Sequence, residues 1–319
     1  MRDALSVVAD IGGTNTRVAL ARGTQVLTDT IRRYRNAEHA GIELVLADFL
    51  SRHDARPEAA CVDMAGPVKD GVGTLTNIDW RVDAAVLQQA TGAGAVAVLN
   101  DLQAQGHAVA HIAGGDLAPV LPGPVAAPGA ARLVVNVGTG LNAVPVFQQA
   151  GLTLVPAAEA GHVTLQALDD EEMRLLKWMQ ARHGNTGLEE ILSGRGLERL
   201  HAWACEDEGA GTPLEAAAIM AAYKDGDARA ARVVRIFVRY LARYAGDLAL
   251  ITLPFGGIYL VGGVVRHLGP HLLDAGFAEA FVDKGRFADF MAQFPVHLVT
   301  DDYAGLRGCA GYIAERLPG

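Results

Sequence analysis

The stretch "VVADIGGTNTRVAL", residues 7–20, decides how the chain begins to fold. Two apolar runs, each typical of a buried strand, flank the turn Asp-Ile-Gly-Gly-Thr-Asn. A tight hairpin needs only two turn residues, such as Asn-Gly or Asp-Gly. The acid, the two glycines, the hydroxyl and the amide are therefore more polar chemistry than a reversal of the chain requires.

The stretch "RLVVNVGTGLNAVPVF", residues 132–147, repeats this pattern of apolar strand, small-residue turn and apolar strand. One constant offset aligns Asp10 with Asn136 and Gly12 with Gly138. Strand-like and helix-like segments alternate over the rest of the chain, which is typical of a layered α/β fold. We interpret the repeat as an internal duplication, one hairpin in each of two α/β domains. Because the match is short, chance similarity is the alternative.

Composition limits the class of protein. With 319 residues, 50% of them hydrophobic, the chain can bury a large core and is long enough for two domains. A net charge of -9 without a basic stripe argues against a nucleic-acid partner. The apolar runs are too short to span a membrane and no signal peptide is evident, so we expect a cytoplasmic protein without a membrane partner. The scattered Cys61, Cys205 and Cys309 fit a reducing compartment better than disulfides or a zinc site.

The spacing of apolar residues predicts one strand over residues 25–34 and one helix over residues 188–206. Residues 114–132 are the richest in glycine and proline, and we expect a linker there.

Three glycine-rich turns follow apolar strands: Gly12-Gly13, Gly138-Thr139-Gly140 and Gly262-Gly263. Glycine lets backbone N–H groups approach a phosphate closely, and a neighbouring hydroxyl adds a donor. A single turn of this kind is more often an ordinary turn. Three of them in one chain favour a nucleotide ligand.

Two common nucleotide-binding patterns do not fit. A Walker A loop needs a lysine after glycine, and no lysine of this chain follows a glycine. Residues 138–143 match the dinucleotide fingerprint G-x-G-x-x-A, but that fingerprint must open a helix, whereas Pro145 lies in a strand-like run. A dinucleotide enzyme therefore ranks low.

Nine motifs, spread in order over nearly the whole chain, resemble those of the bacterial ATP-dependent glucokinases, which are actin-like proteins distinct from the ROK sugar kinases. The motifs are "DIGGTNTRVAL" at 10–20, "AGPV" at 65–68, "LTNIDW" at 75–80, "LNDLQA" at 99–104, "VGTGLN" at 137–142, "EAGH" at 159–162, "LEEILSGRGL" at 188–197, "FGGIYLVGGV" at 255–264 and "DKGRF" at 283–287.

The resemblance implies a two-lobed actin-like ATPase (ribonuclease H-like) fold with a duplicated strand-turn-strand α/β core. It implies a small α/β domain over residues 1–110, with the terminal helix 304–319 packing back on it, and a large α/β domain over residues 111–303. The implied enzyme is a glucokinase, which transfers the γ-phosphate of ATP to the 6-hydroxyl of glucose in the first step of glycolysis. A homodimer is also implied.

Asn100 and Asp101 stand where a strand-like run ends and a helical run begins. From the residues alone a helix N-cap is the favoured interpretation, although ligands also bind at this edge of an α/β sheet. The resemblance implies that both residues bind the sugar and that Asp101 is the catalytic base, which takes the proton from the 6-hydroxyl. A carboxylate suits this role because phosphoryl transfer depends mainly on positioning and on neutralising charge.

The resemblance implies three further sugar-binding residues, Glu159, His162 and Glu189, with Glu190 as the adjacent alternative to Glu189. From the residues alone, Glu159 and His162 are solvated loop residues or an E-x-x-H metal pair. Asp10 is implied to lie near Mg²⁺, indirectly through the ATP phosphates. The residues implied to bind ATP are Gly12, Gly13, Thr14, Asn15, Gly138, Thr139, Gly140, Gly256, Gly257, Gly262 and Gly263.

Asn136 and Asn142 depart from the resemblance, because the family usually has glycine at both positions. Asn tolerates a positive φ better than most residues, so the second turn can survive the change. The Asn142 amide then either crowds the phosphate or replaces a water. Two other functions stay open: a kinase for another hexose, such as mannose or fructose, and a non-catalytic sugar-binding sensor. ADP and polyphosphate are alternative phosphoryl donors.

Overall fold

The computed structural model describes residues 4–75, 78–112 and 114–317. Contacts between residues divide the chain into two compact units. Unit 1 comprises Met1–Asp116, Val146–Ala157 and Asp301–Gly319, and unit 2 comprises Leu117–Pro145 and Ala158–Thr300. The expected division into 1–110 with 304–319 and 111–303 stays a prediction. The grouping by contacts differs from it in placing residues 111–116, 146–157 and 301–303 with unit 1. Residues 76–77 of the "LTNIDW" motif and 318–319 of the expected terminal helix lie outside the described residues.

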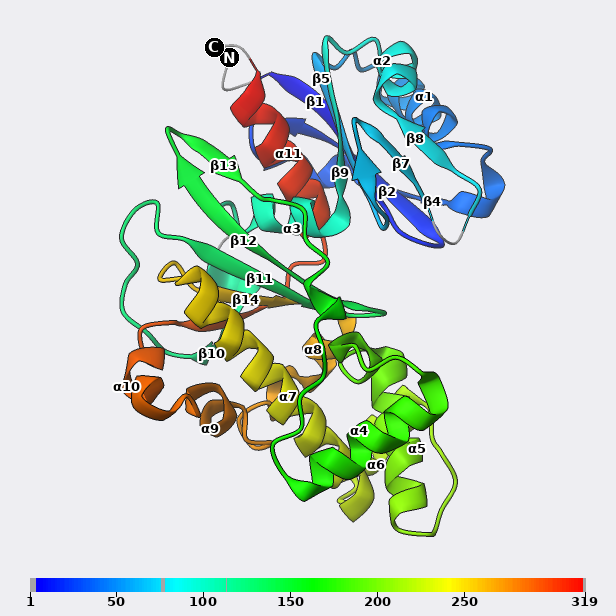
Figure 1. The fold of residues 1–319 in the computed structure, drawn as a ribbon. Coiled ribbons are helices and arrows are strands. Elements are labelled where there is room, and N and C mark those ends of the chain that lie inside the picture. The colour runs from blue at the N-terminus through cyan, green and yellow to red at the C-terminus, as the bar shows by residue number, and fades with distance from the viewer. Residues whose placement is uncertain (1–3, 76–77, 113, 318–319) are drawn as a thin grey trace. The chain divides into compact units, whose positions relative to one another are not determined.

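The sheet of unit 1 mixes antiparallel and parallel pairing (Figure 1). Its strands, in spatial order, are β3 (Gln25–Val26), β2 (Asn15–Arg22), β1 (Leu5–Ile11), β5 (Ala59–Met64) and β9 (Ala95–Asn100), and β4 (Arg32–Arg35) also pairs with β2. The first hairpin was predicted correctly, since β1 and β2 are antiparallel neighbours. The single strand predicted over 25–34 is wrong: a 3₁₀ turn at Thr28–Thr30 interrupts it, and Thr30 Oγ1 accepts a hydrogen bond from Leu20 N at 3.0 Å.

Helices cover both faces of this sheet. Val7 and Ile11 point toward one face, where α1 (Ile42–His53) and α2 (Ala84–Thr91) complete the apolar core. Val8 points to the other face and packs with α11 (Ala304–Arg316), which lies against α3 (Asp101–Ala108). A Cβ on Gly308 would lie 1.8 Å from Ala104 O, so only glycine permits this close approach of α11 to α3. A small sheet is formed by β6 (Val68–Lys69), β7 (Val72–Thr74) and β8 (Arg81–Asp83).

The second large sheet carries the second hairpin. Its strands, in spatial order, are β10 (Leu117–Leu121), β15 (Val296–Val299), β14 (Ile258–Val261), β11 (Arg132–Val137), β12 (Leu141–Gln149) and β13 (Leu152–Leu154), and the division between the units falls within β12. The predicted linker over 114–132 is wrong in part, because residues 117–121 form the edge strand β10. An edge strand tolerates Pro119, which lacks the N–H group that a central strand would need.

Unit 2 buries its apolar residues around a long helix, α7. Val233, Phe237, Leu241 and Ala245 recur at helical spacing on its buried face. The unit's helices are α4 (Asp170–His183), α5 (Gly194–Asp207), α6 (Ala216–Lys224), α7 (Ala228–Thr252), α8 (Gly263–Leu268), α9 (Phe277–Val282) and α10 (Ala288–Met291). The helix predicted over 188–206 begins only at Gly194. Ser193 caps it, since its Oγ accepts from Gly196 N at 3.0 Å.

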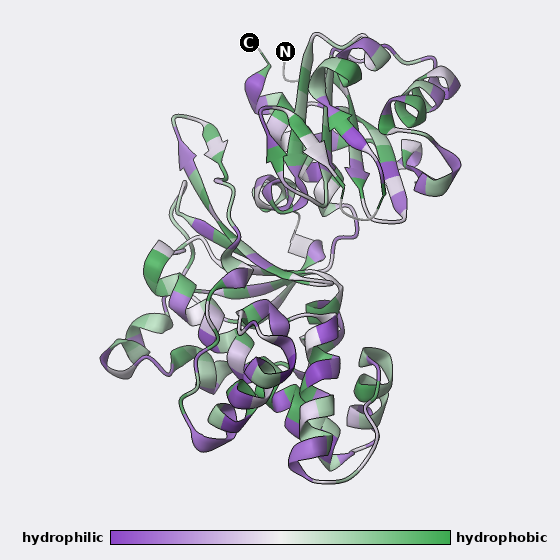
Figure 2. Ribbon diagram, turned by 45° about the vertical axis from the view of Figure 1, so that its right-hand side comes forward, coloured by the Kyte–Doolittle hydropathy of each residue, from purple (hydrophilic) through white to green (hydrophobic). Residues whose placement is uncertain are grey.

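Hydrophilic and hydrophobic turns are interspersed along the helices of unit 2 (Figure 2). The buried carboxylate of Glu172 pairs with Arg239 at 2.9 Å and with Arg243 at 2.6 Å, so this charge is compensated inside the unit. Among the helices described, none is long and apolar enough to cross a membrane.

Candidate functional site

Three neighbouring strands of unit 1 end in acidic or amide side chains. Asp10 in β1 lies opposite Asp63 in β5, and Asp63 lies opposite Leu99 in β9, directly before Asn100. Since β1, β5 and β9 are parallel, these residues and Asp101 share the carboxyl edge of one sheet. Ligands of open α/β sheets bind at this edge.

Asn100 is the N-cap of α3. Its Oδ1 accepts from Leu102 N at 3.0 Å, its Nδ2 donates to Gly66 O at 3.0 Å, and Gln103 completes a capping box. The structural interpretation made from the sequence is therefore confirmed for Asn100. Asp101 is the first residue of α3, and its Oδ1 accepts from Leu102 N at 2.8 Å. A carboxylate at the start of a helix is favoured in its ionised form by the helix dipole.

The turn between β1 and β2 is closed from within unit 1. Gly12 N donates to Asn15 O at 3.0 Å, and the buried Asn36 donates from Nδ2 to Gly12 O at 2.8 Å. Asp10 pairs with Arg17, its direct neighbour across the hairpin, at 3.1 Å. Gly12, Gly13 and Asn15 are partly exposed and Thr14 is exposed, so the polar groups of the turn are accessible.

Asp63 is an acid at this edge that the sequence analysis missed. Its side chain is buried, and its Oδ2 accepts a hydrogen bond from Cys309 Sγ at 3.3 Å. A Cβ on Gly305 would lie 3.0 Å from Asp63 Oδ2 and 3.2 Å from Asp10 Cγ, so Gly305 leaves room for both carboxyl groups. Burial raises the pKa of Asp63 well above its usual range, and the charges of Asp10 and Asp101 raise it further. The signal available in the sequence was an acid inside the apolar run "ACVDM".

The second turn, between β11 and β12, is held by other parts of unit 2. Gly138 N donates to Gly140 O at 2.9 Å, and Gly194 N, at the start of α5, donates to Gly138 O at 3.0 Å. Gly262 has a φ of 107°, and a Cβ there would lie 2.4 Å from Val137 O. The structure thus brings Gly138, Gly140 and Gly262 to one end of the sheet, together with Gly194, which the sequence analysis missed.

Some of these glycines are required by the fold and others are not. Gly262 is required by its φ and by its contact with Val137 O, and at Gly140 a Cβ would lie 2.6 Å from Glu189 Oε2 and would displace this carboxylate. A Cβ on Gly138 would meet nothing nearer than 3.8 Å, and a Cβ on Gly263 would meet nothing within 4 Å. Neither Gly138 nor Gly263 has a positive φ. Glycine at these two positions is therefore explained better by a ligand that approaches the backbone than by packing.

Gly256 and Gly257 lie at the other end of the same sheet. They precede β14, and Gly256 N donates to Ala131 O at 2.7 Å, next to the start of β11. Gly262 follows β14, whose four residues span roughly 13 Å. The structure therefore does not bring Gly256 and Gly257 together with the glycines of the second turn.

Glu159 and His162 lie on the exposed segment between β13 and α4. Their side chains make no hydrogen bond or ion pair with other described residues, so both can bind a ligand. His162 lies in a 3₁₀ turn, Ala160–His162, rather than on an α-helix. An E-x-x-H pair for a metal needs the two side chains on one helix, and this interpretation is therefore wrong.

The two candidate glutamates have different partners. Glu189 Oε2 accepts from Leu141 N at 3.0 Å, so its carboxylate lies at the second turn. Glu190 is paired with Arg199 instead. The geometry favours Glu189 over Glu190 as the residue next to the turn and to the 159–162 segment.

Asn136 and Asn142 do not use the backbone freedom expected of them, since neither has a positive φ. Asn142 Nδ2 donates to Ala158 O at 2.6 Å, and its Oδ1 accepts from Ala160 N at 2.8 Å. The side chain is thus turned toward residues 158–160. The expectation that Asn142 faces a phosphate is corrected accordingly.

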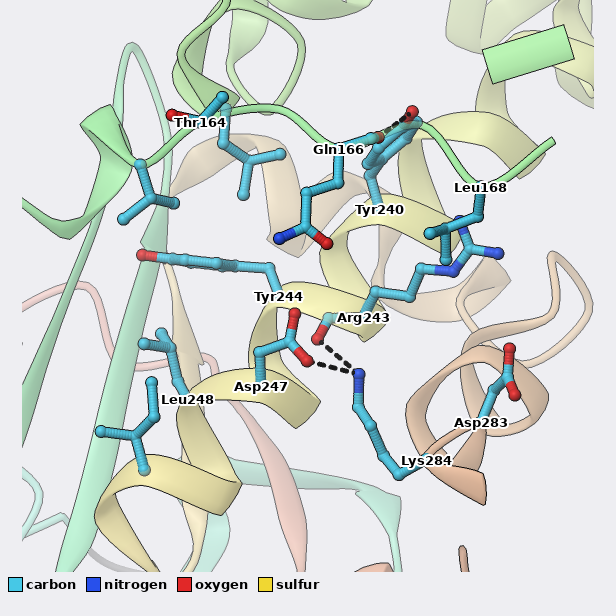
Figure 3. A pocket seen from close by; sticks show the side chains of 13 residues that line it. Thr164, Gln166, Leu168, Tyr240, Arg243, Tyr244, Asp247, Leu248, Asp283 and Lys284 are labelled. Atoms are coloured by element: carbon cyan, nitrogen blue, oxygen red, sulfur yellow. Dashed lines mark hydrogen bonds and ion pairs between the residues drawn. The ribbon is translucent and has the colours of Figure 1, made fainter. Parts of the chain in front are cut away.

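A cavity of about 430 Å³ lies in unit 2 beside α7. None of the site residues predicted from the sequence lines it, although Val163 and Leu188 do, each adjacent to a predicted sugar-binding residue. Figure 3 shows Tyr240, whose hydroxyl donates to Gln166 O at 2.8 Å and so anchors the segment after His162. Lys284 bonds to Asp247 at 2.7 Å in the same view.

A sequence model of the family "Glucokinase" matches residues 7–316. The chain belongs to the glucokinase family. This confirms the family that the motifs indicated, and it makes the chain a member of a sugar-kinase family.

Individual proteins agree with this assignment. Glucokinase of Marinobacter nauticus is 37% identical over 311 residues, covering 96% of each chain. The crystal structure of a glucokinase from an Antarctic psychrotroph superposes with a TM-score of 0.89 at 29% identity, covering 97% of this chain and 98% of the other. A ROK family glucokinase from Streptomyces griseus, described as a complex with glucose and AMPPNP, has a TM-score of 0.62 at 20% identity, covering 96% and 98%. The fold is therefore the actin-like α/β fold of sugar kinases, as expected from the motifs.

Proposed function

We propose that this protein is a glucokinase that transfers the γ-phosphoryl group of ATP to the 6-hydroxyl of glucose. The match to the glucokinase family over nearly the whole chain carries this proposal. The Streptomyces griseus neighbour, with glucose and an ATP analogue bound, supports the same pair of substrates.

Asp101 is the proposed catalytic base. It stands at the carboxyl edge of the unit 1 sheet as the first residue of α3, where the positive end of a helix dipole favours a carboxylate over a carboxylic acid. In that state it accepts the proton of the sugar 6-hydroxyl as the oxygen attacks phosphorus. Asn100 holds the backbone of this corner through its cap and offers its amide to a neighbouring hydroxyl.

Glu159, His162 and Glu189 are the proposed partners of the other sugar hydroxyls. Glu159 and His162 are exposed and have no partner among the described residues, and Glu189 is directed to the second turn. Polar side chains that read hydroxyls reject sugars lacking them, because the side chains would be left unpaired. We therefore expect this set to favour one hexose over its deoxy analogues.

The glycine turns fit a nucleotide. At Gly138 and Gly263 neither packing nor φ requires glycine, so a ligand close to the backbone explains both. The other proposed phosphate contacts are Gly12, Gly13, Thr14, Asn15, Thr139, Gly140 and Gly262. We leave Gly256 and Gly257 out, since they lie at the opposite end of β14.

Mg²⁺ also fits the site, through Asp10. Within the described residues no three His, Cys, Asp or Glu side chains are arranged to hold a metal ion, so Asp10 would act on Mg²⁺ through the ATP phosphates. Mg²⁺ commonly keeps several waters and binds substrate phosphates together with one or two carboxylates. When bound, it neutralises the charge that develops on the transferred group.

A cytoplasmic homodimer is the assembly that we propose from the family resemblance.

The decisive experiment is a coupled assay of the purified protein with glucose, mannose and fructose against ATP, ADP and polyphosphate. We expect the highest kcat/KM for glucose with ATP. A higher value for another hexose would make the protein a kinase of that sugar. Glucose binding by calorimetry without phosphoryl transfer from any donor would identify a sugar-binding sensor instead.

A further inference from the structure

Asn142, the second residue of β12, is bonded entirely to backbone. Its Nδ2 donates to Ala158 O at 2.6 Å, and its Oδ1 accepts from Ala160 N and from Ala143 N, each at 2.8 Å. The first two bonds cross 16 and 18 residues of sequence and reach the peptide groups on both sides of Glu159. One side chain thus fixes the backbone around a proposed sugar-binding residue.

The start of β12 also supports the other proposed sugar-binding residues. Leu141 N donates to Glu189 Oε2 at 3.0 Å. Gly161 lies so close to the strand that a Cβ there would be 1.8 Å from Leu141 O. Leu141 and Asn142 together therefore form a scaffold on which Glu189 and the segment 158–162 rest.

The backbone of residues 158–160 makes few other hydrogen bonds. Apart from a local bond from His162 N to Glu159 O, the hydrogen bonds of the 158–160 backbone within the described residues go to Asn142. The chain after His162 borders the cavity beside α7 and is anchored further on, where Tyr240 bonds to Gln166 O (Figure 3). Loss of the Asn142 bonds would therefore leave the backbone of residues 158–160 without a hydrogen bond to β12.

We propose that Asn142 is a positioning residue for sugar binding, which holds Glu159 and His162 in the orientation that meets the hydroxyls of a hexose. This inference rests on the proposed function and deepens it. The described hydrogen bonds of the Asn142 side chain all go to backbone groups. It acts through the backbone of residues 158–160, and its removal changes the affinity for sugar rather than the affinity for ATP.

The test uses Asn142→Asp and Asn142→Gly in the full-length protein. The Asp variant has the same shape but places an oxygen against Ala158 O where the amide donated a hydrogen bond. We expect both variants to fold, as judged by circular dichroism, and to raise the KM for glucose about tenfold or more, with the KM for ATP within about twofold of wild type. Hydrogen exchange of residues 158–162 should become faster in Asn142→Gly.

Two comparisons separate positioning from packing. Asn136→Gly removes the asparagine on the other side of the second turn, whose Oδ1 faces Gly262 and not residues 158–160. This variant should leave the KM for glucose near the wild-type value. In a Glu159→Gln background, Asn142→Asp should raise the glucose KM much less, because the two residues act on the same contacts. A purely structural role predicts independent effects.

The outcomes distinguish this inference from the function on which it rests. An active wild type whose glucose KM is unchanged in Asn142→Asp overturns the positioning role alone. If wild type binds glucose without phosphoryl transfer, the same comparison is made on the dissociation constant by calorimetry. A wild type that neither binds nor phosphorylates glucose overturns both.

Discussion

The two strand-turn-strand hairpins share a sequence pattern, but the carboxylate at each turn comes from a different part of the chain. In the first, Asp10 belongs to the hairpin itself and pairs with Arg17 across it at 3.1 Å. In the second, Asn136 stands at the equivalent place, and the carboxylate at the turn comes from Glu189, which bonds to Leu141 N. The acid of the first turn, Asp10, lies on a strand of the hairpin, whereas the acid at the second turn, Glu189, lies on a segment outside the hairpin.

This difference extends to the surroundings of each hairpin. Asp63 lies near the end of β5, the parallel neighbour of β1, and Asn100 ends β9, the next strand, directly before Asp101 opens α3. Unit 1 thus places its acids on strands and a helix. Unit 2 places Glu159, His162 and Glu189 on connecting segments that rest on β12. Chemistry that needs a fixed proton acceptor suits the first arrangement, and recognition of several hydroxyls suits the second.

The largest expected effect tests the rigid acid of unit 1. Asp101→Asn should lower kcat roughly 10²- to 10⁴-fold, because the proton acceptor is lost, while the amide can still bond a sugar hydroxyl. Glucose should bind within about an order of magnitude of wild type by calorimetry, and the melting temperature should be nearly normal. Steady-state kinetics measure the loss.

Asp83→Asn is the control, since Asp83 also lies where a strand meets a helix, and its carboxylate likewise accepts a hydrogen bond from the first turn of that helix, from Ala85 N at 2.9 Å. It should leave kcat unchanged. If Asp101→Asn retained most of the wild-type turnover, Asp101 would be a helix-capping residue and not the base.

The next largest effect concerns Asp63, the buried acid at the same edge of the sheet. Because the folded protein raises the pKa of Asp63, it binds a proton that the unfolded chain releases above about pH 4. The contribution of Asp63 to the free energy of unfolding is therefore fully present below that pH. It is lost as the pH rises toward the raised pKa, by at most about 1.4 kcal/mol per pH unit.

Asp63→Asn should remove this loss, so its stability relative to wild type should increase from pH 5 to pH 7. Urea unfolding at several pH values measures the difference, with the exposed Asp29→Asn as control. A difference between Asp63→Asn and wild type that does not vary with pH would mean that Asp63 is ionised in the fold.

The smallest expected effect tests Glu189, the acid at the turn of the second hairpin. In Gly140→Ala the new methyl group would lie 2.6 Å from Glu189 Oε2, so the carboxylate must move away from Leu141 N. The KM for glucose should rise about tenfold, equivalent to about 1.4 kcal/mol. In Gly138→Ala the methyl group meets nothing nearer than 3.8 Å, and the change should act on the KM for ATP instead. Kinetics with each substrate varied measure both changes, and a rise in the KM for ATP with an unchanged KM for glucose in Gly140→Ala would place Glu189 in the nucleotide site.

The sequence by itself determined both hairpins and the family. The apolar runs and polar turns of residues 7–20 and 132–147 predicted both hairpins, and the order of motifs indicated the glucokinase family, which the match over residues 7–316 confirms. These signals are local: strand periodicity and turn composition are written in neighbouring residues. The N-cap at Asn100 could be predicted for the same reason.

The tertiary structure decided which distant residues meet. The register of β1 against β5 sets Asp63 beside Asp10, and the packing of α11 buries it. The parallel pairing of β11 with β14 brings Gly262 to the turn that contains Gly138. The bonds from Asn142 to residues 158–160 likewise depend on how a connecting segment folds back on β12. Such contacts join residues far apart in sequence, so no local periodicity or turn signal encodes them, and only the packing of the whole fold selects them.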